Sequence, residues 1–288
     1  MAQPSDFHSF RHGQFDITVL SDGDISLGGE MFAPEGNAEE RAEILRRLGG
    51  DGGTANAQSN IPLIVTGHEV ILVDVGAGNR FQPSEGKLEG NLRAVGVDPG
   101  DITTIVISHA HPDHIWGMLR DDGSLRFPNA RCFVGWEEWN FWNGEAAGAL
   151  PEGMQPFVQG ARRDLMAITE RMTLVADGDE IVPGIKVLAT PGHTPGHISL
   201  VLEGEVPLIV TVDATASEIV SFEHPDWSFG FDMQPDLAVR TRHALLERAA
   251  AENAKLLGFH WTYPGVGRIE KTAEGYRFHG VATAKVPS

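Results

Sequence analysis

The sequence predicts an α/β fold in which sheets are covered by helices on their outer faces. Short apolar runs typical of strands alternate with segments whose apolar residues recur at spacings of three and four. The early strand-like runs follow one another directly, with Gly67-His68 as a hairpin turn, whereas helical segments separate the later ones. Because neither a repeat nor a low-complexity linker interrupts the 288 residues, we expect a single domain over residues 1–288.

The predicted strands are short runs rich in β-branched and other apolar residues, several of them bounded by glycine, proline or aspartate. In chain order they are Phe15–Leu20, Ile61–Val65, Val70–Val73, Thr104–Ser108, Cys132–Val134, Ile185–Ala189, Ile198–Leu202, Leu208–Val212 and Lys255–Phe259. The predicted helices have one apolar face each. They are Ala38–Leu48, Glu85–Val95, Trp136–Trp142, Gln155–Thr169 and Pro235–Ala251.

Composition narrows the possible functions. The 40 Asp and Glu residues outnumber the 22 Lys and Arg residues, and the net charge of −18 disfavours nucleic acid as a partner. Small neutral or weakly charged substrates are expected instead. No apolar stretch approaches the roughly 20 residues that span a bilayer, and residues 1–24 contain no secretory signal, so we expect a cytoplasmic protein with no membrane partner. Cys132 is the only cysteine, which excludes an internal disulfide and a cysteine-based zinc site.

One segment has a pattern that packing does not require. The run from Ile105 to His114 begins as a buried strand and then offers four possible metal ligands within six residues. Because side chains alternate along a strand, His109 and His111 are expected to face the same side, whereas the turn at Pro112 directs Asp113 and His114 to a neighbouring position. Nitrogen and carboxylate donors in two such groups suit two adjacent cations of the Zn²⁺ type.

These residues resemble a known family. His109-Ala-His111-Pro-Asp113-His114 matches the signature of the metallo-β-lactamase superfamily, and further elements of that family follow in order. They are the third-histidine element Pro191-Gly-His193-Thr-Pro-Gly-His197, the bridging-aspartate element Thr211-Val-Asp213-Ala and the final-histidine element Gly258-Phe-His260-Trp. The resemblance spans roughly residues 61–276 and implies the αββα four-layer sandwich of the metallo-β-lactamase fold.

The resemblance implies a dinuclear site with seven ligands. The first metal would be bound by His109, His111 and His193, the second by Asp113, His114 and His260, and Asp213 would bridge them. The two divalent ions are expected to be Zn²⁺, with Mn²⁺, Co²⁺ and Fe²⁺ as alternatives. A hydroxide shared by the two metals would be the nucleophile.

Three further residues have expected roles near this site. Asp113 is expected in the first place to be a metal ligand, and the resemblance to some lactonases of the superfamily implies that it can also carry a proton to the leaving group. Asp74, in Ile71-Leu-Val-Asp74-Val-Gly-Ala-Gly78, is implied to orient loops or a histidine without binding metal itself. The role of His197 stays open, although its place at the start of a strand suggests a local hydrogen bond.

Within the superfamily, the chain most resembles the branch of methyl parathion hydrolase and related lactonases and arylesterases. Strings such as Gly76-Ala-Gly-Asn-Arg-Phe81-Gln-Pro and Tyr263-Pro-Gly-Val-Gly-Arg carry this resemblance. It implies that an aromatic leaving-group pocket is lined by Phe81, Trp142 and Phe157. Ala216 stands three residues beyond the bridging aspartate, where acyl-homoserine lactonases of the superfamily often carry a tyrosine, so a tyrosine contact to the lactone is not expected.

The expected function is that of a dinuclear metal-dependent hydrolase that cleaves lactones or aryl and other carboxylic esters. Phosphotriester hydrolysis is the alternative within the same chemistry, because a metal-activated hydroxide beside aromatic walls suits both. An iron-dependent oxidoreductase on the same fold is the alternative from another class. A homodimer is a weaker expectation from the resemblance.

Overall fold

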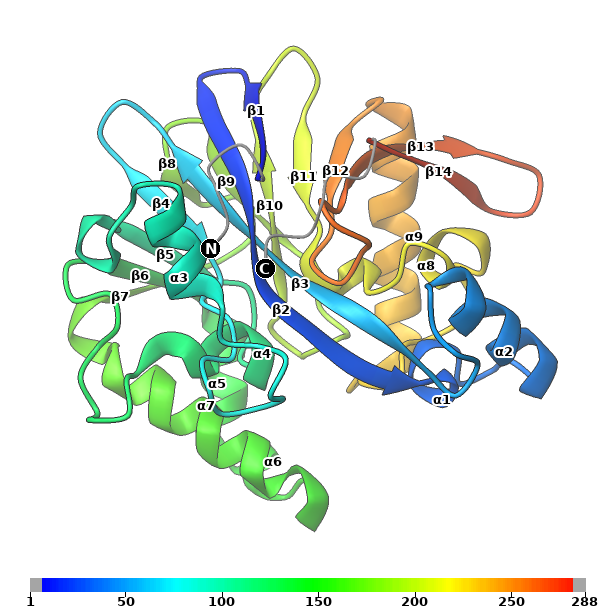
Figure 1. The fold of residues 1–288 in the computed structure, drawn as a ribbon, viewed down its shortest axis with the longest axis horizontal. Coiled ribbons are helices and arrows are strands. Elements are labelled where there is room, and N and C mark those ends of the chain that lie inside the picture. Colours follow the sequence, from blue (N-terminus) through cyan, green and yellow to red (C-terminus); the bar gives the residue numbers. More distant parts are fainter. Residues whose placement is uncertain (1–6, 282–288) are drawn as a thin grey trace.

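The chain, seen in a computed structural model that describes residues 7–281, forms two seven-stranded sheets (Figure 1). The first sheet has the strand order β1-β2-β3-β4-β5-β6-β7. Its strands are β1 (His8–His12), β2 (Phe15–Gly28), β3 (Thr54–Val65), β4 (Val70–Val73), β5 (Thr104–Ile107), β6 (Arg131–Gly135) and β7 (Met172–Val175). Pairing is antiparallel from β1 to β4 and parallel from β4 to β7.

The second sheet has the order β14-β13-β12-β11-β10-β9-β8. Its strands are β8 (Glu180–Val182), β9 (Ile185–Ala189), β10 (Ile198–Leu202), β11 (Leu208–Val210), β12 (Lys255–Leu257), β13 (Val266–Lys271) and β14 (Tyr276–Gly280). Only β11 and β12 pair in parallel among these strands. One apolar core contains side chains of both sheets, such as Ile17 and Ile105 from the first and Val187 and Leu200 from the second.

Helices cover the outer sides of this pair of sheets. They are α1 (Gly29–Phe32), α2 (Ala38–Arg47), α3 (Leu88–Ala94), α4 (Pro112–Ile115), α5 (Trp136–Asn143), α6 (Glu145–Gly148), α7 (Gln155–Ala167), α8 (Val220–Glu223) and α9 (Pro235–Ala251). In Figure 1, α3, α5 and α7 accompany the first sheet, and α9 runs beside β12 of the second. Leu245 and Leu246 of α9 pack on Ile209 and Leu256, which confirms the predicted helix–sheet–sheet–helix architecture.

The clearest apolar patterns are predicted with the correct limits, as at β4, β9, β10 and α9. The helix predicted over Glu85–Val95 is shorter and begins at Leu88. Gly86 has a φ of 86°, in the left-handed region that a helix excludes, and the Asp22 carboxylate accepts the N–H groups of Gly86 and Leu88. The segment before Leu88 is therefore a loop.

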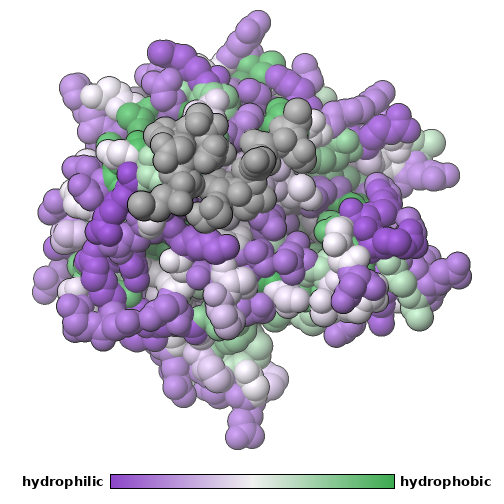
Figure 2. All heavy atoms as spheres, in the orientation of Figure 1, coloured by the Kyte–Doolittle hydropathy of each residue, from purple (hydrophilic) through white to green (hydrophobic). Residues whose placement is uncertain are grey.

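The strands that escape prediction are polar or lie toward the sheet edges. β1, β7, β8, β13 and β14 have short or largely exposed sequences, and β2 and β3 extend beyond the predicted runs through paired segments in which polar residues are interspersed with apolar ones such as Ile25 and Ala57. The face of the molecule shown in Figure 2 is correspondingly dominated by hydrophilic side chains, with apolar residues in small separate groups. Within residues 7–281, no helix has the length and apolar character needed to cross a membrane.

Candidate metal centre

The seven side chains predicted as metal ligands lie together where strands of both sheets end. His109 and His111 follow β5, and Asp113 and His114 belong to the single turn of α4. The other three come from the loop between β9 and β10 and from the segments after β11 and β12, and they are His193, Asp213 and His260. Because β11 and β12 run in parallel, their carboxyl ends bring Asp213 and His260 to the same edge.

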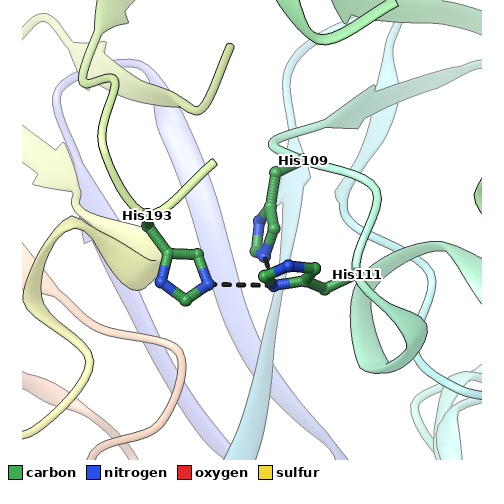
Figure 3. Close-up of side chains that lie close together, drawn as sticks. All are labelled: His109, His111 and His193. Carbon is green, nitrogen blue, oxygen red and sulfur yellow. Dashed lines mark hydrogen bonds between the residues drawn. The ribbon is translucent and has the colours of Figure 1, made fainter. Parts of the chain in front are cut away.

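Three histidines form the first cluster (Figure 3). The Nδ1 atom of His111 lies 3.1 Å from Nε2 of His109 and 3.0 Å from Nε2 of His193. All three rings are buried, and their nitrogens converge on one point. This geometry agrees with the sequence expectation that His109 and His111 face the same side.

The second cluster contains Asp113, His114 and His260. The Oδ2 atom of Asp113 lies 3.3 Å from Nε2 of His114 and 3.3 Å from Nε2 of His260. Asp213 stands between the clusters, because its Oδ2 atom is 3.2 Å from both His193 and His260 and its Oδ1 atom is 3.6 Å from His114. This is the position that a bridging carboxylate requires.

The donors in these clusters fit divalent cations. Within the described part of the chain, Nε2 of His114, Oδ2 of Asp113 and Oδ1 of Asp213 are buried without a hydrogen-bond partner. A buried polar atom left unpaired costs roughly 1–3 kcal/mol, so three such atoms at one point indicate a missing positive partner. Imidazole nitrogens with carboxylate oxygens are the donor set that Zn²⁺ and similar metals accept.

The charges of the site depend on burial and on the neighbouring carboxylates. Burial, with its histidine neighbours, holds the pKa of His109 well below its ordinary value, so this ring is neutral and presents a lone pair. Burial alone would also lower the pKa of His114, but Asp113, Asp213 and Asp74 outweigh it and raise that pKa. Burial opposes ionisation of Asp113, yet its histidine neighbours bring the pKa down to about 2, which keeps it a carboxylate.

Contacts of the Nδ1 atoms fix the orientation of four of the five histidine rings that are predicted to bind metal. The Nδ1 atom of His114 lies 2.8 Å from Oδ2 of Asp74, whose oxygens also accept the backbone N–H and the hydroxyl of Ser108 at 2.8 and 2.7 Å. The other Nδ1 contacts are 3.0 Å from His109 to Ser108 Oγ, 2.9 Å from His193 to Asp232 and 2.9 Å from His260 to the Gln58 carbonyl. Such partners select the tautomer that leaves Nε2 free for a metal.

Glu138 connects the two loops that carry most of the histidines. Its carboxylate is completely buried on α5 and accepts four hydrogen bonds. Oε1 accepts from the Ala110 N–H at 2.8 Å and from Trp142 Nε1 at 2.6 Å, and Oε2 accepts from the Thr194 hydroxyl at 2.7 Å and the Gly196 N–H at 3.1 Å. Burial raises the pKa of Glu138, and these four donors oppose the shift.

His197 lies behind the clusters and not in them. Its Nδ1 atom is 2.8 Å from the Thr190 hydroxyl, and its Nε2 atom accepts the backbone N–H of Asp213 at 3.2 Å. His197 therefore holds the residue that stands between the two clusters. This role agrees with the expected local hydrogen bond immediately before β10.

A narrow cavity opens onto the two clusters, and its other walls are apolar. These walls are formed by Ile25, Pro112, Phe81, Phe157, Phe229 and Phe231. The ring of Phe81 lies edge-on to Phe157, with 6.0 Å between the centroids. Two of the three aromatic residues expected in the pocket, Phe81 and Phe157, therefore line it.

Trp142 lies elsewhere than the sequence suggests. Its side chain is completely buried and does not contribute to the cavity wall, because Nε1 is taken by Glu138 and the ring stands edge-on behind His111 at 6.0 Å. Phe229 and Phe231 stand in the wall instead. The sequence offered no signal for these two residues beyond a local excess of aromatic side chains, and none for Asp232. Glu138 could have been found from the sequence, because it stands four residues before Trp142 and therefore on the same helix face.

The chain matches one family model, and it is similar both to curated proteins and to solved structures. Residues 55–260 match the family model described as the metallo-beta-lactamase superfamily. An N-acyl homoserine lactonase of Bacillus thuringiensis is 32% identical over 166 residues, which are 57% of this chain and 57% of that protein. A similar enzyme of Bacillus sp. is 32% identical over 153 residues, covering 52% and 53% of the two chains. The alignments thus span only a little over half of these curated relatives.

Two solved structures are similar to nearly the whole length of the chain. One is a product complex of AidC, described as a dizinc quorum-quenching lactonase, with a TM-score of 0.89 and 30% identity over 97% of this chain and 98% of that one. Another is AbOPH, described as a hydrolase in the beta lactamase superfamily, with a TM-score of 0.88 and 28% identity over the same shares of the two chains.

Proposed function

The chain belongs to the metallo-beta-lactamase superfamily, and on this premise we propose that it is a dinuclear metal-dependent hydrolase that opens the ring of neutral acyl lactones. The observation that carries the proposal is the pair of donor clusters on either side of Asp213, at the floor of a cavity with aromatic walls. The lactonase names of its relatives in Bacillus and of AidC support the same substrate class.

Two divalent cations in the clusters would polarise the substrate carbonyl and lower the pKa of the water that attacks it. His109, His111 and His193 would hold the first cation, Asp113, His114 and His260 the second, and Asp213 both. Zn²⁺ fits this donor set, and the similar structure AidC is described as a dizinc enzyme.

The residues of the chain would orient the substrate and move one proton. Phe81, Phe157 and Phe229 present apolar surface to an acyl group, and no Lys or Arg lines the cavity within the described residues, which favours a neutral substrate. Addition of water to the lactone carbonyl releases a proton, and cleavage of the ring C–O bond requires one on the departing oxygen. We assign this transfer to the carboxylate of Asp113, because this residue lines the cavity.

Phosphotriester and aryl ester hydrolysis remain the second candidate, because aromatic walls also suit an aryl leaving group. The test compares kcat/KM for an acyl lactone series, an aryl ester and a dialkyl aryl phosphotriester on one zinc-loaded preparation whose metal content is measured. We expect close to two metal ions per chain and the highest kcat/KM with a lactone. A preparation with one iron per chain that consumes oxygen would contradict the proposal.

Two variants tie this activity to the clusters. His109→Ala and Asp213→Ala should lose metal and lactone hydrolysis together, since each removes a donor from the centre. His243→Ala is a matched control, because His243 is a partly exposed histidine whose contact is with Asp226. Full turnover by either cluster variant would refute the assignment.

A further inference from the structure

An ion pair is buried beside the first cluster. Asp232 follows the cavity residues Phe229 and Phe231, and Arg242 lies in the middle of α9. Their side chains are 0% and 2% exposed, and Nη2 of Arg242 lies 3.3 Å from Oδ2 of Asp232. Burying two charges costs several kcal/mol for each ion, so such a pair is weak as a purely stabilising device, and a role in specifying geometry is a reasonable alternative.

The other contacts of Asp232 reach both the candidate metal centre and the cavity wall. Oδ1 accepts the Nδ1 proton of His193 at 2.9 Å, and Oδ2 accepts the backbone N–H of Phe229 at 2.8 Å. With its Nδ1 proton donated to a carboxylate, His193 keeps the Nε2 lone pair free, and that atom faces His111 and Asp213 at 3.0 and 3.2 Å. One carboxylate therefore orients a predicted ligand and holds the backbone of Phe229, one of the residues of the cavity wall.

Arg242 extends these contacts to the bridging residue. Its guanidinium donates to the carbonyl of Ala214, which directly follows Asp213, at 3.4 Å. It also donates to the carbonyls of Pro225 and Trp227, in the segment that leads to Phe229. Because all these contacts are made by one side chain of a rigid helix, α9 holds the segments of Ala214, of Pro225 and Trp227, and of Asp232 relative to one another.

The second cluster lacks an equivalent arrangement within residues 7–281. There Asp74 orients His114 with the help of Ser108, and no Arg or Lys that the structure describes lies within salt-bridge distance of Asp74. The two clusters thus have separate buried carboxylates. Removing one of these carboxylates should therefore disturb one cluster more than the other.

We propose that Asp232, balanced by Arg242, is a positioning residue that holds His193 and the wall residue Phe229 in one arrangement, so that it sets both the metal affinity of the three-histidine cluster and the acyl selectivity of the cavity. The metal-affinity part depends only on the donors of this chain. The selectivity part rests on the proposed lactonase function.

The test uses Asp232→Asn and Arg242→Lys in the full-length protein, with Asp226→Asn as the matched control. Asp226 belongs to the same segment, but its side chain is 83% exposed and contacts only His243 among the described residues. Zinc release is followed against increasing concentrations of a chelator. In Asp232→Asn, one of the two zinc ions should be released with roughly 10–100-fold weaker affinity, while the other is retained as in the wild type.

Cobalt substitution gives a second readout that does not depend on turnover. The visible absorption of Co²⁺ at the three-histidine cluster should change in Asp232→Asn and stay unchanged in Asp226→Asn. Arg242→Lys keeps a cation next to Asp232 but cannot reach all three carbonyls, so it should shift zinc release in the same direction by a smaller factor. If circular dichroism shows that Asp232→Asn does not fold, Arg242→Lys decides the question.

Selectivity is measured as the ratio of kcat/KM for short and long acyl lactones, which should change in Asp232→Asn by more than in Asp226→Asn. If Asp232→Asn released both zinc ions at the chelator concentrations that the wild type requires, the proposal would be overturned. Where only Arg242→Lys folds, the same result from that variant would overturn it. A wild-type protein that binds two zinc ions but hydrolyses no lactone would refute the proposed function and leave the metal-affinity result valid. If both zinc ions were bound more weakly to the same extent, the proposal for Asp232 would also be overturned, because a general loss of structure would produce that result.

Discussion

Replacing Glu138 by glutamine tests how strongly the site depends on one buried carboxylate. In the wild type, two donors meet each oxygen of Glu138. Glutamine has the same shape, but one oxygen becomes an NH₂ group that donates. If this group faced Ala110 and Trp142, two N–H donors would lose their acceptor. If it faced Thr194 and Gly196, the Thr194 hydroxyl could rotate and accept, and only the Gly196 N–H would stay unpaired.

The second orientation is cheaper, and its cost can be estimated. One buried donor without an acceptor costs roughly 1–3 kcal/mol, partly offset because a neutral side chain replaces a desolvated carboxylate whose pKa is raised by burial. Glu138→Gln should therefore lower the free energy of unfolding by about 1–2 kcal/mol. Glu138→Ala removes the acceptors of all four donors and should cost about 4 kcal/mol or more.

Urea denaturation of the metal-free protein measures these differences, and metal content measures the effect on the centre. The Gly196 N–H lies in the loop of His193, so Glu138→Gln should also bind zinc more weakly. Glu137→Gln is the matched control, since Glu137 is the exposed neighbour on the same helix. Unfolding and zinc binding indistinguishable from the wild type in Glu138→Gln and Glu138→Ala would refute the reasoning.

Three further predictions concern residues outside the centre. Burial raises the pKa of Asp22 from 3.8 to about 6, so the folded state keeps a proton that the unfolded chain has released, and stability falls as the pH rises through this window. The free energy of unfolding of Asp22→Asn, measured by urea denaturation, should therefore rise by about 3 kcal/mol relative to that of the wild type between pH 3.5 and pH 7. A difference that does not change with pH would contradict this. Burial raises the pKa of the Cys132 thiol to about 12, so a thiol reagent should modify Cys132 only as the protein unfolds, and rapid labelling of the native protein would be inconsistent with its 1% exposure. Ala216 is 1% exposed in a cluster with Ile25 and Phe229, so Ala216→Tyr should destabilise the fold by about 1–3 kcal/mol without improving the proposed lactone hydrolysis, and an unchanged Tm would argue against this packing.

The parts of the fold that the sequence predicts are those in which burial dictates the pattern. Strand β4 is a continuous apolar run, β10 is apolar except for Ser199, and α9 repeats its apolar residues at helical spacing, so each pattern indicates its element directly. Strand β13 is only six residues long, its buried and exposed residues do not alternate regularly, and its pairing with β14 depends on partners that a single sequence does not reveal. Such strands are formed by tertiary contacts more than by local preference.

The candidate site divides in the same way. His109, His111 and Asp113 are recognisable because they crowd within a few residues, and the distant His193 and His260 are recognisable through family motifs. Asp232 is 39 residues from the histidine that it orients, and nothing in the intervening sequence relates the two. A hydrogen bond between a predicted metal ligand and a side chain distant in the sequence forms only when the chain folds. The sequence therefore contains no separate pattern that predicts it.

The balance of charge around the clusters links metal binding to protons. Asp113 and Asp213 are buried carboxylates in direct contact with His114 and His260, and they raise the pKa of both rings although burial alone would lower it. These carboxylates therefore favour a proton on either ring when no cation is bound. A metal ion needs the Nε2 lone pairs, so it must displace those protons and take over the role of balancing charge. Metal affinity must therefore fall as the pH falls, and it must fall more steeply at the cluster of Asp113, His114 and His260 than at the three-histidine cluster, where burial already keeps His109 and His111 neutral.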